Sequence, residues 1–359
     1  MIETTASARR VQEDASGRPP RFFNGRMHMT AKSPIALWGM TAFIVAILMC
    51  QVAGAQNSEP PQGRPGDDYT LQLNANMVVL SATVLGHHNE LVSGLGKDNF
   101  QIYEDGVLQQ IRYFSHEDIP VTVGILVDNS GSMGPKRADV IAAAMAFARS
   151  SNPQDQMFVV NFNDRVSFGL PSNTPFTDRK DQLQLALSQI RTIGQTALYD
   201  GMVAGFDRLK QGDRDKKVLI LISDGGDNAS KHSLAQVIEL AKQSAAIIYS
   251  IGIFDEQDGD RNPAVLNRFA KATGGEAFFP ETSKEIAPIC EGIARDIRNQ
   301  YTLSYVPTIA RQDGSYRVIE VKASAQGRGR LSVRTRAGYS VPSTPPTPVA
   351  RAIRHDIPN

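Results

Sequence analysis

The chain has 359 residues, with 38 Lys and Arg against 37 Asp and Glu, and 41% of its residues are hydrophobic. This length allows two domains of about 150 residues each. The formal net charge of +1 gives no electrostatic basis for binding nucleic acid or an anionic membrane surface, so neither is expected as a partner.

The first 55 residues are predicted to be a leader that serves export. Residues 35–49 are predominantly apolar, follow a basic stretch and precede the small residues of 53–55. This pattern is typical of a secretory signal peptide, so residues 1–55 are interpreted as a leader. We therefore expect a secreted, periplasmic or cell-envelope protein. An uncleaved N-terminal membrane anchor is the alternative, although the apolar core is shorter than the ~20 residues of a spanning helix.

A proline-rich linker at residues 56–68 leads into a predicted β accessory segment, residues 69–117. Residues 77–84 indicate one strand or two. Residues 100–103 alternate between polar and apolar, Asp105-Gly106 is a hairpin turn signal, and residues 107–114 are predicted to form the returning strand.

From residue 120 to 299 the pattern changes to apolar strands that alternate with amphipathic helices. The strands are predicted at residues 121–127, 157–162, 218–222, 247–253 and, more weakly, 277–279. Continuous apolar strands separated by helices favour an α/β fold, a Rossmann-like doubly wound, mostly parallel sheet with helices on both faces. Residues 166–170 are the candidate for one antiparallel edge strand.

After residue 300 the hydrophobic period returns to two, which predicts a C-terminal β segment at 300–340 with strands near 301–305, 319–323 and 331–333. Neither β segment is long enough to close a core alone. We therefore expect the two to pair in one sandwich-like accessory domain, with 120–299 inserted between them. The proline-rich residues 341–359 are predicted to be a disordered tail.

Three loops are expected to meet at the carboxyl ends of the parallel strands, where ligands bind in such sheets. They are Asp128–Ser132, Gly194–Thr196 and Ser223–Gly226. Together they offer carboxylates and hydroxyls, the oxygen ligands that suit a hard cation such as Mg²⁺ or Ca²⁺ rather than zinc. Taken singly, each residue would equally suit a helix cap or a turn.

The spacing of five residues resembles the metal-ion-dependent adhesion site of von Willebrand factor type A domains. That family's pattern is Asp-x-Ser-x-Ser, a later Thr, and an Asp that closes a buried strand. The matching residues are Asp128, Ser130, Ser132, Thr196 and Asp224. The flanking β segments further resemble exported "VWFA-related" proteins of Acidobacteria and neighbouring bacterial groups.

This resemblance implies a metal site with Asp128, Ser130, Ser132, Thr196 and Asp224 around Mg²⁺, or around Ca²⁺ or Mn²⁺. The three hydroxyls would bind the ion directly, and the two carboxylates largely through water. Because neutral hydroxyls leave the ion much of its charge, one open position would accept a Glu or Asp carboxylate of a partner protein. The implied function is an exported, metal-dependent protein-binding or adhesion module.

Two alternatives remain at this point. The ion could only stabilise the fold of a structural or assembly protein, or, less favoured, it could assist hydrolysis. No enzyme is expected, because the region around Ser130 lacks Gly-x-Ser-x-Gly and residues 131–136 fail the phosphate-loop spacing. Four further residues are expected near the same edge as caps or exposed side chains, namely Asp200, Asp227, His232 and Asp255.

Overall fold

The structure is a computed structural model that describes residues 77–341, apart from 189–190, 255–258, 260 and 310–312. These residues all belong to the second of the two units into which the chain divides, residues 70–359. The predicted leader, linker and C-terminal tail from residue 342, and Asp255, lie outside the described residues. Within the described part of the chain, no helix has the length and apolar character needed to cross a membrane.

A six-stranded sheet forms the centre of the α/β domain, in the order β10-β9-β8-β5-β6-β7. All neighbouring strands are parallel except β7, which runs antiparallel at the edge. The predicted sheet and its edge strand are thus confirmed. The strands are β5 (Val121–Asp128), β6 (Gln156–Phe162), β7 (Val166–Phe168), β8 (Lys216–Ser223), β9 (Ile247–Gly252) and β10 (Ala277–Phe278).

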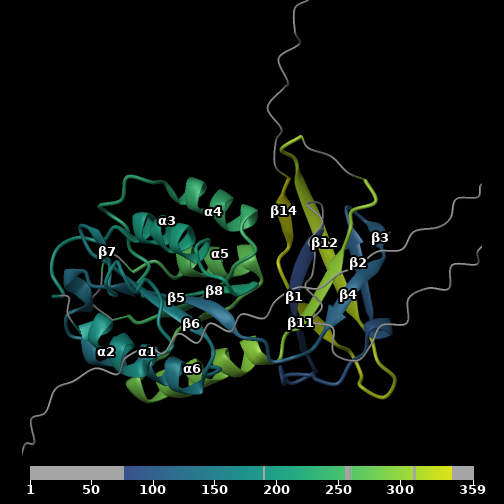
Figure 1. The fold of residues 1–359 in the computed structure, drawn as a ribbon, viewed down its shortest axis with the longest axis horizontal. Helices are drawn as coiled ribbons and strands as arrows, with labels where there is room; N and C mark the ends of the chain where they lie inside the picture. Colours follow the sequence, from purple (N-terminus) through teal and green to yellow (C-terminus); the bar gives the residue numbers. More distant parts are fainter. Residues whose placement is uncertain (1–76, 189–190, 255–258, 260, 310–312, 342–359) are drawn as a thin grey trace, which may run out of the picture. The chain divides into compact units, whose positions relative to one another are not determined.

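Helices cover both faces of this sheet, as its continuous apolar strands require. On one face α1 packs against α2 and α6, and on the other α4 packs against α3 and α5 (Figure 1). All eight residues of the central strand β5 are therefore buried. The helices are α1 (Arg137–Ser150), α2 (Lys180–Ser188), α3 (Leu198–Leu209), α4 (Leu234–Gln243), α5 (Pro263–Thr273) and α6 (Ser283–Arg298).

Local sequence signals explain where several helices begin and end. Ser233 accepts a hydrogen bond from the backbone N–H of Gln236 and forms a capping box at the start of α4. Asn262 caps α5, whose first residue is Pro263, and Gly274 ends it with a left-handed φ of 80°. These ends lie where the sequence signals place them.

The strands that precede the α/β domain in the chain pair with the strands that follow it. They form two four-stranded sheets, β13-β1-β11-β4 and β14-β12-β2-β3. β11 lies between β1 and β4, and β12 pairs with β2, all antiparallel. Side chains of both sheets share one hydrophobic cluster that includes Leu80, Ile102 and Leu303. The strands are β1 (Val78–Leu85), β2 (Phe100–Glu104), β3 (Val107–Gln109), β4 (Ile111–Ser115), β11 (Tyr301–Tyr305), β12 (Tyr316–Ala323), β13 (Ser332–Arg334) and β14 (Gly338–Ser340).

The predicted fold class, a mostly parallel α/β sheet with a flanking β-sandwich, is confirmed, but two strand predictions need correction. The expected single strand 107–114 is two strands, because β3 pairs with β2 whereas β4 pairs with β11 of the other sheet. β14 was not predicted, and it pairs with the first residues of β12. The Asp105-Gly106 hairpin turn is confirmed, with φ values of 48° and 79°.

A buried lysine at the start of β8 makes stability depend on pH. Lys216 is 9% exposed and its ammonium donates a hydrogen bond to the carbonyl of Ile297. Burial lowers the pKa of Lys216 to about 8, although the carboxylates of Asp296, Asp118 and Asp155 act in the opposite direction. Between pH 8 and 10.5 the unfolded chain therefore binds more protons at this residue than the folded chain does.

We predict that the free energy of unfolding contributed by Lys216 rises as the pH increases from 8 to 10.5. Urea unfolding of the wild type and of Lys216→Met over this range would measure the contribution as a difference. The wild type should gain stability relative to the variant as the pH rises. A constant difference across the range would contradict the prediction.

Candidate metal centre

Two buried carboxylates lie side by side at the carboxyl edge of the central sheet. Asp128 is the last residue of β5, and Asp224 directly follows β8. These strands are parallel neighbours, with Val127 opposite Ile222, so their ends reach the same edge. Asp128 is 2% exposed and Asp224 is 1% exposed. Such burial is costly for carboxylates unless each is hydrogen-bonded or paired with a cation.

The serines of the first loop connect these two carboxylates. The Ser132 hydroxyl donates a hydrogen bond of 2.6 Å to Asp224 Oδ2 and lies 3.1 Å from the Ser130 hydroxyl. The Ser130 backbone N–H donates to Asp128 Oδ1 at 2.9 Å. Four of the five predicted residues are thus joined in one hydrogen-bonded cluster.

The loop that carries Thr196 is joined to the first loop by a backbone hydrogen bond. The N–H of Gly131 donates to the carbonyl of Gly194 at 3.0 Å, which joins the first loop to the second. The Thr196 N–H donates to Asn228 Oδ1 at 2.8 Å, and the Asn228 N–H donates back to the Thr196 carbonyl at 3.0 Å. All three predicted loops therefore meet at this edge.

The charges of the cluster favour a bound cation. Burial, and secondly the neighbouring Asp224 carboxylate, raise the pKa of Asp128 to about 6, although hydrogen bonds from Ser130 and Ser223 act in the opposite direction. A divalent ion would offset both the desolvation and the repulsion between the carboxylates. The donors are all oxygens, which fits Mg²⁺, Ca²⁺ or Mn²⁺. In the described part of the chain there is no group of three or more His, Cys, Asp or Glu side chains that could hold a metal ion.

The remaining residues predicted near this edge have structural roles. Asp227 Oδ1 accepts a hydrogen bond from the N–H of Tyr199 in the first turn of α3, and so caps that helix from another loop. Asp200 accepts from the backbone of Lys231 and lies 2.7 Å from Nδ1 of His232, whose side chain is 43% exposed. These two carboxylates hold the loop between β8 and α4 against α3.

Several residues around the site were not predicted. The Ser223 hydroxyl donates to Asp128 Oδ2 at 2.6 Å. Asp164, in the loop after β6, accepts a hydrogen bond of 2.5 Å from the N–H of Gln195 and so holds the loop that carries Thr196. Asn161 is the second-last residue of β6, at the same edge of the sheet. A polar residue at the end of a predicted strand was the sequence signal that could have identified it.

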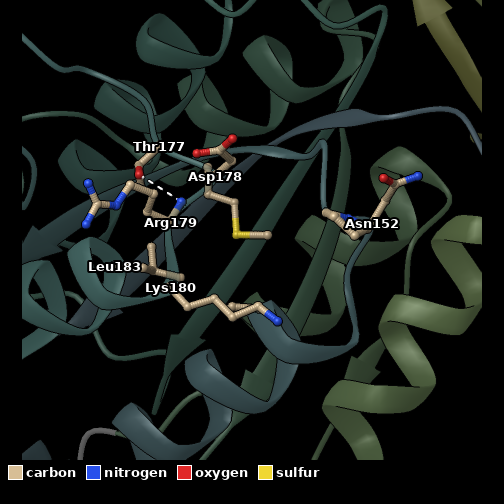
Figure 2. A pocket seen from close by; sticks show the side chains of 9 residues that line it. Asn152, Thr177, Asp178, Arg179, Lys180 and Leu183 are labelled. Carbon is tan, nitrogen blue, oxygen red and sulfur yellow. Dashed lines mark hydrogen bonds between the residues drawn. The ribbon is translucent and has the colours of Figure 1, made fainter.

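A small cavity lies at the opposite end of β6, near its amino end (Figure 2). Thr177 and Met157 exchange backbone hydrogen bonds there, and Thr177 Oγ1 accepts from the N–H of Arg179 at 3.0 Å. Its volume of about 10 Å³ holds no more than a water molecule. This cavity belongs to the turn that starts α2 and offers no second ligand site.

The chain is similar to several solved structures at low sequence identity. Among solved structures, the chain is similar to an aerotolerance-related membrane protein from Bacteroides fragilis NCTC 9343 (16% identity, 49% of this chain and 98% of that chain, TM-score 0.41). It is also similar to a von Willebrand factor type A protein from Catenulispora acidiphila (13% identity, 76% and 75%, TM-score 0.45). A third is proximal thread matrix protein 1 from the mussel byssus, described with a zinc-occupied MIDAS motif (18% identity, 54% and 49%, TM-score 0.42).

No curated protein matches the chain. The family model of the von Willebrand factor type A domain matches residues 122–290, which hold the central sheet and all three loops of the cluster. The described structure of this segment is the α/β fold that the match implies. Residues 122–290 of this chain are a von Willebrand factor type A domain.

Proposed function

We propose that the protein is an exported, metal-dependent module that binds a partner protein through an acidic side chain. Domains of this family are in general interaction modules rather than enzymes. The observation that supports the proposal most is the joining of Asp128, Ser130, Ser132 and Asp224 in one cluster at the sheet edge, with Thr196 beside it. This set combines two buried carboxylates with three hydroxyls.

The composition of this set favours binding over simple stabilisation by the ion. In our proposal Ser130, Ser132 and Thr196 would hold Mg²⁺, and the carboxylates of Asp128 and Asp224 would orient it. Neutral hydroxyl ligands leave a divalent ion much of its positive charge, so the bound ion would supply an attachment point for a partner's Glu or Asp. The chain's own residues bury and orient this donor set.

The arrangement of the chain is part of the proposal. We infer that residues 120–299 are a domain inserted into an accessory sandwich built from 69–117 and 300–340. Export rests on the predicted signal peptide in 1–55, and the relation to exported bacterial "VWFA-related" proteins stays a prediction. Strand pairing on both sides of the inserted segment supports the arrangement, since β11 and β12 pair with β1, β4 and β2.

The test uses Thr196→Ala, because the backbone hydrogen bonds of Thr196 keep its loop in place without the hydroxyl. Calorimetric titration with Mg²⁺ should show affinity lower by at least about tenfold in this variant. The exposed Thr174→Ala is the matched control and should bind as the wild type does. Equal Mg²⁺ affinity in all three proteins would overturn the proposed site.

Capture experiments separate the binding function from the alternative in which the ion only stabilises the fold. The wild type would be used to capture proteins from envelope and extracellular fractions, with Mg²⁺ or with EDTA. Binding predicts that EDTA and Thr196→Ala both abolish Mg²⁺-dependent capture while the melting temperature changes little. If EDTA lowers only the melting temperature and capture persists, the stabilising function is correct.

A further inference from the structure

Arg137, at the start of α1, directs its side chain away from its own helix. Its Nη1 donates to Asn129 Oδ1 at 2.6 Å and to Thr192 Oγ1 at 3.2 Å. Its Nη2 donates to the carbonyls of Leu187 and Ser188, both at 3.1 Å. One guanidinium thus contacts the Asp128–Ser132 loop, the segment before Thr196 and the last turn of α2.

The position of Arg137 is explained by these acceptors rather than by α1. A cation at the first residue of a helix faces the positive end of the helix dipole, which disfavours it. The same guanidinium lies at the carboxyl end of α2, where free carbonyls and the negative end of the dipole favour a cation. The planar fork of donors on arginine suits several acceptors at once, which a lysine ammonium does not.

Asn129 connects this guanidinium to the candidate metal centre. It is completely buried and stands between Asp128 and Ser130 in the chain. Its side-chain nitrogen donates to the Val127 carbonyl at 3.1 Å and to Asn161 Oδ1 at 3.0 Å, so its side-chain oxygen is the atom that accepts from Arg137.

The backbone of Asn129 is fixed as well. Its N–H donates to the Phe162 carbonyl at 2.7 Å, and its carbonyl accepts from the N–H of Ile193 at 3.0 Å. Ile193 directly follows Thr192, the second side-chain acceptor of Arg137. Two independent connections therefore join the loop of Ser130 to the segment that leads to Thr196.

We propose that Arg137 is a positioning residue for the metal centre. Through Asn129 and Thr192 it holds the loop of Ser130 and Ser132 at a fixed distance from the loop of Thr196, with the end of α2 as its anchor. This inference rests on the proposed function, because it assigns a role in binding the same ion.

In a neutral variant of Arg137, the lost charge and the lost hydrogen bonds should change the Mg²⁺ affinity in opposite directions. The positioning role can therefore be tested. Loss of a nearby positive charge would by itself strengthen the binding of a divalent cation. Loss of the hydrogen bonds would let the loops separate and would weaken binding. Weaker binding in a neutral variant can therefore not be an electrostatic effect.

The experiment is a calorimetric titration of the full chain with Mg²⁺, repeated with Mn²⁺. Arg137→Met should lower the affinity by about 10- to 100-fold, the usual cost of losing a residue that orients a metal ligand. Arg137→Lys keeps the charge but should also bind more weakly, because one ammonium cannot serve acceptors on separate segments. The matched control is Arg149→Met, an exposed arginine on the same helix, which should bind as the wild type does.

A double-mutant cycle with Asn129→Ala tests whether Arg137 affects Mg²⁺ binding through Asn129. Arg137→Met should lower the Mg²⁺ affinity by a smaller factor in the Asn129→Ala variant than in the wild type, because the shared contact is already lost. The two factors should differ by about threefold or more. Circular dichroism checks that each variant is folded. If Arg137→Met does not fold, the comparison is made with Arg137→Lys. If the wild type binds Mg²⁺ and Thr196→Ala does not, but folded Arg137 variants bind as the wild type or tighter, the positioning role is wrong and the site stands. If the wild type itself binds neither ion, the proposed function and this inference are both wrong.

Discussion

Replacing Asp296 by Leu is expected to lower the free energy of unfolding by about 3–5 kcal/mol, the usual loss when one partner of a buried ion pair is removed. Asp296, on α6, is 5% exposed and accepts hydrogen bonds from the hydroxyls of Thr83 at 2.6 Å and Tyr249 at 2.7 Å. It also pairs with the guanidinium of Arg334. Burial, and secondly the Asp296 carboxylate, raise the pKa of Tyr249 well above its ordinary value, so this hydroxyl remains a donor.

The substitution would remove contacts from both the sandwich and the α/β domain. Thr83 and Arg334 belong to strands β1 and β13 of the sandwich, whereas Tyr249 and Asp296 belong to β9 and α6 of the α/β domain. Without the carboxylate, the two buried hydroxyls would lose this acceptor, and the Arg334 guanidinium would retain its ion pair with Glu276. Asp296 therefore links Thr83 and Arg334 of the sandwich to Tyr249 of the α/β domain.

Urea unfolding followed by circular dichroism would measure the effect. The exposed Glu291, also on α6, provides the control, since Glu291→Ala should change stability by no more than about 0.5 kcal/mol. The double variant Asp296→Leu with Arg334→Met should lose less stability than the sum of the single variants, because both substitutions remove the same Asp296–Arg334 ion pair. A loss below about 1 kcal/mol for Asp296→Leu would contradict this account.

The central sheet could be predicted from the sequence because its signals are local. Residues 121–127 form a mostly apolar run, and Ile286, Ile289, Cys290, Ile293 and Ile297 recur at helical spacing, so each element is encoded within about 15 residues. Four of these five residues are buried in the structure, and Ile289 is partly buried against the same core. The split of 107–114 into β3 and β4 depends instead on pairing with β11, almost 200 residues later in the chain, and no local pattern reveals it.

The residues of the candidate site also fall into those that the sequence could predict and those that it could not. Asp128, Ser130, Ser132, Thr196 and Asp224 could be proposed because each follows or precedes a predictable strand or helix. The residues that hold them could not, because their partners are distant. Ser223 contacts Asp128 on the neighbouring strand, about 95 residues earlier in the chain, and Arg137 contacts the end of α2, about 50 residues later. Such contacts follow from the packing of the folded chain, which spacing alone does not determine.

Replacing Gly225 by Ala is expected to disturb the metal centre and the stability of the domain together. Gly225 directly follows Asp224 and has a φ of 83°, a conformation that costs a residue with a side chain about 1–3 kcal/mol. A Cβ atom at this position would lie 2.4 Å from the carbonyl oxygen of Asn262. That carbonyl has little freedom to move, because the Asn262 N–H donates to the Asp224 carbonyl at 2.9 Å and its side chain caps α5.

The backbone of residues 224–226 must therefore shift instead, and the 2.6 Å hydrogen bond from Ser132 to Asp224 would lengthen or break. We expect Gly225→Ala to lose at least about 2 kcal/mol of stability in urea unfolding and to bind Mg²⁺ more weakly in a calorimetric titration. Gly292→Ala is the matched control, since a Cβ at this helical glycine of α6 would meet no atom within 4 Å. That substitution should raise stability by about 0.5–1 kcal/mol and leave Mg²⁺ binding unchanged. Wild-type stability together with wild-type Mg²⁺ affinity in Gly225→Ala would show that the contact between Gly225 and Asn262 does not hold Asp224 in place.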